Sequence, residues 1–258
     1  MKPNLPDSLG SRLEGFSFLE IKLGHSGARV FKLERAGSEP LILKFAPNSG
    51  SAVSGAFVHD DAARLAWTNT KNLPVARLET YLEHDGFEYL LMSEVRGREA
   101  SQPWEPEQIP TVIENMAHGL RQWHDTPADD CPFHLSLADE IKDIQTRYVD
   151  NTIRRLELEA LLERKPQSED LVLCQGDPCG ANVFLGDDLE ITGWIDLGSL
   201  CVMDRHCDLA QAVISLNREI NRQFNGWSER FLEVYGLDLV NRDTLEFYVQ
   251  FDRFFWGD

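Results

Sequence analysis

Gln175-Gly176-Asp177-Pro178-Cys179-Gly180-Ala181-Asn182, followed by Ile195-Asp196-Leu197-Gly198, is the stretch of sequence that decides the fold and its chemistry. Its first Asp and its Asn are spaced as D-x-x-x-x-N, and a D-x-G follows nineteen residues after that Asp. Phosphoryl transfer needs one carboxylate to orient and deprotonate an acceptor hydroxyl, and an Asn and an Asp to hold the Mg²⁺ that neutralises the phosphates. The spacing therefore predicts Asp177 as the catalytic base, with Asn182 and Asp196 as Mg²⁺ ligands.

The residues around this stretch predict how it is held. Residues 171–174 are a short apolar strand, so that residues 175–182 form the loop that leaves it. A turn signal at 186–188 lies between two further apolar runs, 183–185 and 191–195, and predicts a hairpin. We expect this hairpin to return Asp196 toward Asn182, where oxygen atoms of both could reach one Mg²⁺.

Hydrophobic periodicity divides the chain into two parts. Up to residue 95 it favours strands at 16–23, 30–33, 41–45, 75–83 and 87–93, with a short helix at 59–69. After Gly97 it favours long amphipathic helices at 106–125, 136–164, 207–223, 227–235 and 242–256. The sequence therefore predicts an α+β protein with an antiparallel, β-rich N-terminal lobe (1–95) for nucleotide binding. The larger, mainly helical C-terminal lobe (96–258) would carry catalysis and the acceptor, with the nucleotide in the cleft between the lobes.

Composition limits the partners and the compartment. The 258 residues carry 43 acidic and 25 basic side chains, a formal charge of −18, which disfavours nucleic acid and anionic membranes and favours a cationic partner. No apolar run approaches the roughly 18 residues of a membrane span, and no signal core begins the chain, so we expect a cytoplasmic protein. In that compartment we expect the five cysteines to be free thiols. A zinc site at Cys174, Cys179, Cys201 and Cys207 with His206 is disfavoured, because its spacings match neither C-x₂-C nor a familiar His-Cys pattern.

Segments along nearly the whole chain carry a family resemblance. They are residues 24–33 around Gly24-His25-Ser26-Gly27-Ala28, Leu43-Lys44-Phe45, residues 61–67, 73–75, 90–95, Leu120-Arg121-Gln122-Trp123-His124, the two metal-site segments and residues 247–255. With these segments the chain resembles the aminoglycoside 3'-phosphotransferases of the kanamycin and neomycin kinase type. The resemblance implies a bilobal protein-kinase-like fold, ATP or GTP as phosphoryl donor, and a hydroxyl of a small cationic aminoglycoside as acceptor.

The resemblance also implies the nucleotide-side residues. Lys44 would bind the α- and β-phosphates, and Asp61 would orient it where the family has Glu. Because Asp is one methylene shorter, we expect a longer or water-bridged ion pair. Ser26, Gly27 and the amides of their loop would cradle the β-phosphate, while the Ser93 carbonyl and the Val95 amide would take the adenine edge. Two plainer interpretations stay open: a solvated edge-strand lysine at 44, and an ordinary hairpin turn at 24–28.

On the acceptor side the sequence departs from the family, in which several carboxylates line the pocket. Asp150, Glu219 and Asp252 are the candidate substrate-binding acids that remain. Arg218 and Arg253 stand where acids are expected, and they either weaken binding of a polyamine or extend into solvent. Gln175 replaces the His of a His-Gly-Asp motif, which predicts retuned activity. Two alternatives follow: a kinase for another amino- or hydroxyl-containing metabolite or antibiotic, and a catalytically weak nucleotide-binding module.

Overall fold

The computed structural model describes residues 5–22, 27–48 and 58–256, the side chains of residues 219, 220 and 256 excepted. The chain divides into two compact units. The first unit comprises Met1–Arg96 and Gly193–Ser199, and the second comprises Gly97–Thr192 and Leu200–Asp258. The predicted lobes, 1–95 and 96–258, differ from this division chiefly in the segment Gly193–Ser199. Every helix in the described ranges is too short or too polar to span a bilayer.

The first unit is built on a five-stranded sheet whose order is β1-β2-β3-β5-β4. All neighbouring strands are antiparallel. The strands are β1 (Ser17–Ile21), β2 (Arg29–Glu34), β3 (Leu41–Pro47), β4 (Leu78–His84) and β5 (Phe87–Ser93). Strand β3 lies in the middle of this order with a strand on either side, and Leu43, Lys44 and Phe45 at its centre are buried.

One face of this sheet carries an aromatic core under helix α1 (Asp7–Arg12). The ring of Phe45 stacks between Phe31 and Tyr89, at centroid distances of 6.0 and 5.5 Å, from three adjacent strands. Leu9 and Leu13 of the α1 segment pack onto this cluster and are almost fully buried. Burial of such a cluster is the main source of stability in a small sheet unit.

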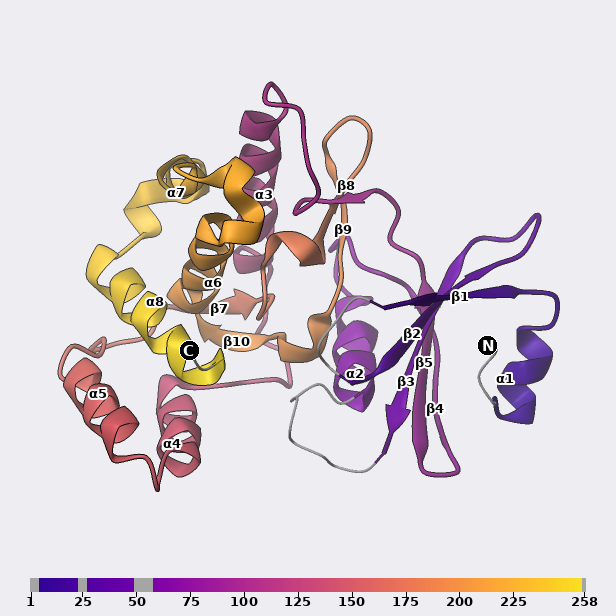
Figure 1. Ribbon diagram of the computed structural model, residues 1–258, viewed down its shortest axis with the longest axis horizontal. Helices are drawn as coiled ribbons and strands as arrows, with labels where there is room; N and C mark the ends of the chain where they lie inside the picture. Colours follow the sequence, from indigo (N-terminus) through magenta and orange to yellow (C-terminus); the bar gives the residue numbers. More distant parts are fainter. Residues whose placement is uncertain (1–4, 23–26, 49–57, 257–258) are drawn as a thin grey trace. The chain divides into compact units, whose positions relative to one another are not determined.

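Helix α2 (Val58–Thr68) lies on the opposite face, toward β4 and β5 (Figure 1). Its N-terminus is held by Glu88 of β5, whose Oε2 accepts a hydrogen bond from the backbone N–H of His59 at 3.1 Å. The short 3₁₀ turn η2 (Leu197–Ser199) packs against α2 as well. The segment that follows the predicted metal ligand Asp196 is therefore part of the first unit.

The second unit contains two small sheets. Strand β7 (Leu171–Cys174) pairs with β10 (Cys201–Asp204) in antiparallel register, with Cys174 opposite Cys201. The other sheet has the order β6-β8-β9, from β6 (Arg98–Glu99), β8 (Val183–Leu185) and β9 (Ile191–Trp194), although the last two residues of β9 are assigned to the first unit. Strands β8 and β9 form the expected hairpin, in which the Gly186 N–H donates to the Glu190 carbonyl at 2.9 Å.

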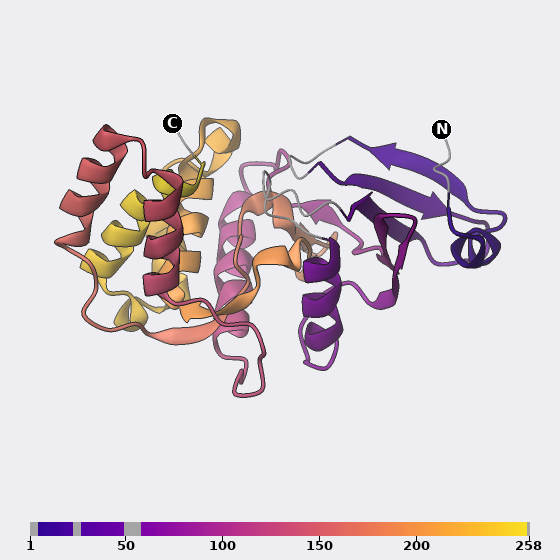
Figure 2. The ribbon, with the colours of Figure 1, turned by 90° about the horizontal axis from the view of Figure 1, so that it is seen from below.

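Helices make up the rest of the second unit (Figures 1 and 2). They are α3 (Ile109–His124), α4 (Leu137–Arg147), α5 (Thr152–Leu162), α6 (Arg205–Asn217), α7 (Ser228–Gly236) and α8 (Arg242–Trp256), with the 3₁₀ turns η1 (Gly180–Asn182), η3 (Glu219–Phe224) and η4 (Leu237–Leu239). Helix α6 packs on α8 and on β7, and α3 packs on α7 and on β7. The loop that leaves β7 is therefore positioned by both α3 and α6.

Most predicted elements are present, and the differences have local causes. The stretch 136–164 is two helices rather than one, because Asn151 caps a new helix by accepting the Arg154 N–H at 3.1 Å. The helix predicted at 207–223 is α6 followed by η3, with extended backbone at Arg218. Helix α1 and strands β6 and β10 have no counterpart in the sequence prediction.

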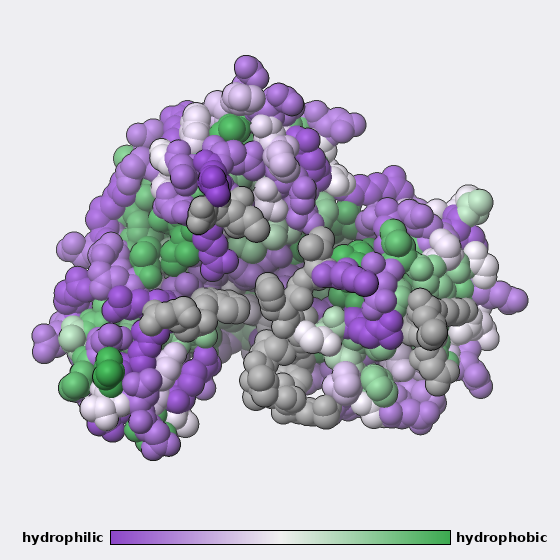
Figure 3. Space-filling view, in the orientation of Figure 1, coloured by the Kyte–Doolittle hydropathy of each residue, from purple (hydrophilic) through white to green (hydrophobic). Residues whose placement is uncertain are grey.

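The visible face is largely hydrophilic, in line with the acidic composition (Figure 3). Green apolar patches interrupt it, one of them over the α5 region at the lower left. Val149, Ile153 and Leu156 of this segment are exposed apolar side chains.

Candidate active site

Asp177 and Asn182 lie together in the loop between β7 and β8. The side-chain Nδ2 of Asn182 donates to Asp177 twice, to its carbonyl oxygen at 2.9 Å and to its Oδ2 at 2.8 Å. Asn182 is 7% exposed, and its Oδ1 accepts no hydrogen bond within the described part of the chain. An amide oxygen left available beside a carboxylate is the type of donor set that Mg²⁺ prefers, so these residues fit the predicted metal.

The backbone ahead of Asp177 is anchored to helix α6 by a buried carboxylate. Asp208 accepts the Gln175 N–H at 2.7 Å through Oδ2 and the Gly176 N–H at 3.0 Å through Oδ1. Gly176 has φ of 92°, in the left-handed region that favours glycine. The side chain of Gln175 is fully buried, and its Oε1 accepts the Asp177 N–H at 2.7 Å. The glutamine at the head of the motif thus supports the loop through a hydrogen bond.

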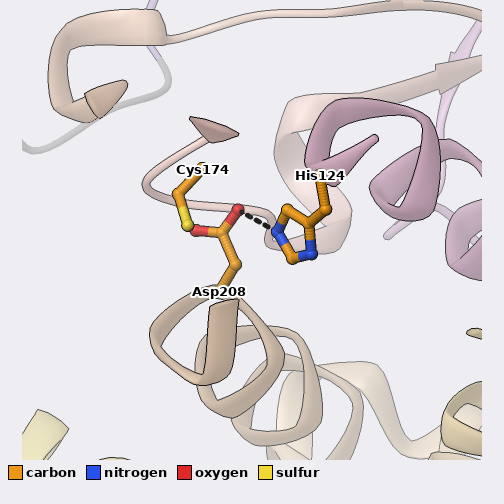
Figure 4. Close-up of side chains that lie close together, drawn as sticks. All are labelled: His124, Cys174 and Asp208. Carbon is orange, nitrogen blue, oxygen red and sulfur yellow. Dashed lines mark hydrogen bonds and ion pairs between the residues drawn. The ribbon is translucent and has the colours of Figure 1, made fainter. Parts of the chain in front are cut away.

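His124, Cys174 and Asp208 form a compact buried cluster behind this loop (Figure 4). One potential ligand atom from each lies within 4.8 Å of the others. However, Asp208 already accepts two backbone N–H groups, and His124 Nε2 lies 3.2 Å from its Oδ2. Burial raises the pKa of the Cys174 thiol well above its ordinary value, so the sulfur keeps its proton. The cluster acts as a hydrogen-bonded support, because His124 and Asp208 already use these atoms to hold each other and the loop.

In the first unit, Lys44 of β3 forms a buried ion pair with Asp61 of α2. Its Nζ contacts Asp61 Oδ2 directly and lies 3.5 Å from Asp196 Oδ1. Burial lowers the pKa of Lys44, but the charges of Asp61 and Asp196 outweigh burial and hold the pKa above its ordinary value. Burial raises the pKa of Asp61, and the Lys44 ammonium opposes that rise. Lys44 is 6% exposed on a central strand, so the interpretation as a solvated edge-strand lysine is wrong.

The expectation of a longer or water-bridged pair at Asp61 is also wrong. The pair is direct because α2 packs closely against η2, which brings the shorter carboxylate within reach. Gly198 of η2 makes this approach possible, since a Cβ at that position would lie 2.7 Å from Asp61 Oδ1. The Oδ1 atom itself is buried without a hydrogen-bond partner.

Asp196 lies between β9 and η2 in a strained conformation. Its φ is 57°, a region that non-glycine residues rarely adopt and that is often kept at functional sites. About half of its side chain is exposed (48%). Asp196 belongs to the first unit, whereas Asp177 and Asn182 belong to the second. The convergence of Asn182 and Asp196 on one Mg²⁺ therefore stays a prediction.

Of the remaining residues assigned to the nucleotide, the structure describes Gly27, Ser93 and Val95. Ser26 lies outside the described residues, and Gly27 has φ of 70°. Ser93 ends β5, and its Oγ accepts the Arg77 N–H at 2.8 Å. The N–H of Val95 donates to no acceptor in the described ranges, which leaves it available to a ligand. Their roles toward a nucleotide stay predictions.

The acceptor-side acids lie on three different segments of the second unit. Asp150 is exposed between α4 and α5, and Asp252 is half-buried on α8. Glu219 begins η3, but its side chain lies outside the described part. Arg218 and Arg253 are both exposed, as the solvent interpretation expects.

The cysteines are unpaired thiols, as predicted. Cys174 and Cys201 pack with Met203 in a small buried cluster, and Cys207 is partly buried against it. The residues that the sequence did not assign to the site are Asp208, His124 and their partner Tyr235. A weak signal was present for Asp208, which ends the segment Asp204-Arg205-His206-Cys207-Asp208.

Comparison with known proteins agrees with this geometry. Residues 17–248 match the family described as the phosphotransferase enzyme family. An aminoglycoside 3'-phosphotransferase from Niallia circulans is 31% identical over 98% of each chain. Another, from Streptomyces fradiae, is 34% identical over 91% of this chain and 94% of its own. A crystal structure of an aminoglycoside-3'-phosphotransferase of type VIII matches with a TM-score of 0.80, at 30% identity and 96% coverage of both chains.

These findings confirm the predicted resemblance and the predicted α+β, protein-kinase-like fold class, with an antiparallel sheet in one unit and mainly helices in the other. They also confirm the predicted type of enzyme, a phosphotransferase with an alcohol group as acceptor. The chain belongs to the phosphotransferase enzyme family, among the relatives of the aminoglycoside 3'-phosphotransferases.

Proposed function

We propose that the protein transfers the γ-phosphoryl group of ATP or GTP to a hydroxyl of an aminoglycoside in a Mg²⁺-dependent reaction in the cytoplasm. The observation that carries the proposal is the Asp177–Asn182 pair, with its carboxylate held by one amide and its backbone held by Asp208 and Gln175. The names of the two relatives support the aminoglycoside as acceptor. A fixed carboxylate at the acceptor hydroxyl is what in-line transfer needs.

The chain's own residues divide the work as follows. Asp177 orients the acceptor hydroxyl and takes its proton. Asn182 and Asp196 offer oxygen atoms to Mg²⁺, which would neutralise charge on the transferred phosphoryl group. Lys44, kept charged by Asp61, binds the α- and β-phosphates, and the binding of the β-phosphate is assigned to Ser26 and Gly27.

The adenine edge is assigned to backbone groups at the end of β5, namely the Ser93 carbonyl and the Val95 N–H. The Val95 N–H, which has no acceptor among the described residues, supports this assignment. A backbone contact of this kind reads the base by its edge and leaves the side chains free to vary. Guanine presents different donors and acceptors on this edge, so it could bind the Ser93 carbonyl and the Val95 N–H only in a different position. A comparison of ATP with GTP as donor therefore tests the role of these two groups.

The acceptor is expected to be cationic. The net charge of −18 attracts a polyamine, and Asp150, Glu219 and Asp252 are the acids assigned to it. Arg218 and Arg253 are exposed, so we assign them no contact with the acceptor. A second candidate, a kinase for a less cationic amino alcohol or antibiotic, is favoured by Arg218 and Arg253, which stand where the resemblance expects acids and so leave fewer carboxylates for a polyamine.

The proposal can be tested by ADP release with ATP and with GTP, each with Mg²⁺. Suitable acceptors are kanamycin, neomycin, streptomycin, simple amino alcohols, and a kanamycin that lacks the 3'-hydroxyl as the matched control. We expect turnover on kanamycin and none on the 3'-deoxy analogue. Turnover on amino alcohols alone would favour the second candidate. Nucleotide binding without turnover on any acceptor would favour a catalytically weak module.

Asp177→Ala separates catalysis from binding. We expect it to abolish steady-state phosphorylation while the dissociation constant for nucleotide stays close to the wild-type value, because Lys44 and its partners are untouched. Asp177→Asn is the matched variant, since it keeps the size of the side chain and the hydrogen bond from Asn182 but cannot take a proton. Retained turnover in Asp177→Asn would contradict the role of Asp177 as base.

A further inference from the structure

A chain of buried polar side chains runs from the surface of the second unit to the loop that carries Asp177. Asp170 binds the guanidinium group of Arg205 through two hydrogen bonds of 2.6 and 3.2 Å. Arg205 Nη1 donates to the Tyr235 hydroxyl at 2.9 Å, and that hydroxyl lies 2.6 Å from His124 Nδ1. His124 Nε2 lies 3.2 Å from Oδ2 of Asp208.

The donors and acceptors in this chain can be assigned one by one. A guanidinium group has only donors, so the Tyr235 oxygen accepts from Arg205. Burial raises the pKa of Tyr235 to about 12, although Arg205 opposes the rise, so the hydroxyl keeps its proton. That proton is then directed at His124 Nδ1. A neutral imidazole with Nδ1 as acceptor carries its proton on Nε2, where it faces the Asp208 carboxylate (Figure 4).

The Asp208 carboxylate is the point at which this chain meets the catalytic loop. It accepts the Gln175 and Gly176 N–H groups, one on each oxygen, and the His124 proton is its third donor. The side chains of His124 and Asp208 are both fully buried. In such surroundings a missing donor is costly and the carboxylate can rotate to compensate. A rotation would displace both backbone N–H groups immediately before Asp177.

We propose that His124 is a positioning residue whose Nε2 proton, fixed in place by Tyr235 and Arg205, sets the orientation of Asp208 and through it the backbone of the Asp177 loop. This inference rests on the proposed role of Asp177. Tyr235 and Arg205 act one step further out, by selecting the tautomer of His124. The three residues come from α3, α7 and α6, so the loop is tied to three helices at once.

Tyr235→Phe tests the tautomer, because it removes one hydroxyl and keeps the ring. In the wild-type protein we expect ¹⁵N NMR of the histidines to show His124 as the neutral form with its proton on Nε2. In Tyr235→Phe we expect His124 to be a mixture of the two tautomers. We also expect kcat to fall about tenfold, the size of effect that the loss of one buried hydrogen bond has, while the KM for nucleotide stays unchanged. Tyr81→Phe, in the other unit, is the control and should change neither quantity.

His124→Gln and His124→Ala complete the test. The amide nitrogen of Gln can take the place of Nε2 and donate to Asp208, so we expect His124→Gln to retain clearly more activity than His124→Ala at equal folded fraction. Equal losses in the two variants would overturn the proposal, and so would a wild-type His124 protonated on Nδ1. If no acceptor is phosphorylated, the proposed function fails, but the NMR result and the rate of ATP hydrolysis without acceptor still decide the role of His124.

Discussion

Glu140→Gln is expected to stabilise the protein at neutral and alkaline pH. Glu140 lies on α4, is 6% exposed, and has one carboxylate oxygen buried without a hydrogen-bond partner. Burial raises its pKa to about 8, and the negative charges of Glu169, Asp204 and Asp252 add to this effect. Among the described residues, Glu140 forms no ion pair with a basic side chain that would offset these negative charges. The folded protein therefore holds Glu140 in its neutral form.

The magnitude follows from linkage between protonation and folding. The folded pKa of about 8 lies above the ordinary value of 4.5, so Glu140 favours folding most at low pH, and this contribution is lost as pH rises toward 8. The unfolded chain ionises freely, while the folded chain cannot until about pH 8. Each pH unit between the two pKa values lowers the free energy of unfolding by about 1.4 kcal/mol. The loss caused by Glu140 is therefore roughly 3 kcal/mol at pH 7 and roughly 5 kcal/mol above pH 8.

Glutamine has nearly the same shape and cannot ionise, so it removes this cost. We expect the melting temperature of Glu140→Gln to exceed that of the wild type by about 5–10 °C at pH 7, and by little at pH 5. Scanning fluorimetry from pH 5 to pH 9 measures the difference, with Glu159→Gln on the exposed face of α5 as control. A difference between Glu140→Gln and wild type that stays constant across this pH range would refute the reasoning.

Three further substitutions or reagents probe other parts of the structure. Gly198→Ala should displace the Asp61 carboxylate and raise the KM for nucleotide about tenfold; an unchanged KM would contradict the close-packing argument. Burial, and secondarily the charge of Asp177, raise the pKa of Cys179 to about 12, so iodoacetamide at pH 8 should label it about a thousandfold more slowly than a free cysteine, whereas urea should restore labelling. Rapid labelling of the native protein would count against this. Ser136→Ala removes the capping box of α4 and should lower the free energy of unfolding in urea by about 1 kcal/mol. An unchanged free energy of unfolding would show that the cap does not stabilise the helix.

The parts of the site that were predictable are local in sequence. Asp177 and Asn182, whose roles the spacing predicts, are five residues apart in one loop, and the structure joins them by a hydrogen bond. The hairpin of β8 and β9 was predictable for the same reason, since its turn residues adjoin its strands. By contrast, His124 lies 84 residues from Asp208. A helix pattern predicts that His124 faces the interior, but no periodicity names the partner it meets there.

The missed elements were unpredictable for a different physical reason. Strand β10 is four residues long and its burial does not alternate, so it lacks the period of a half-buried strand. The break between α4 and α5 falls inside a continuous amphipathic pattern, where one capping residue, Asn151, decides that a new helix begins. Strand β10 is defined by its pairing with the distant strand β7, and at Asn151 a single capping hydrogen bond outweighs the average preference of its neighbours.

The wrong expectation at Asp61 came from comparing side-chain lengths on a fixed backbone. The backbone is not fixed, because the separation of α2 from η2 depends on what lies between them. With no side chain at Gly198, α2 can approach until the shorter carboxylate meets Lys44 directly. The shorter carboxylate of Asp61 is therefore compatible with a direct ion pair, provided that residue 198 stays small. A glutamate at 61 would then carry one methylene too many for the space against η2, and so would strain the pair rather than restore it.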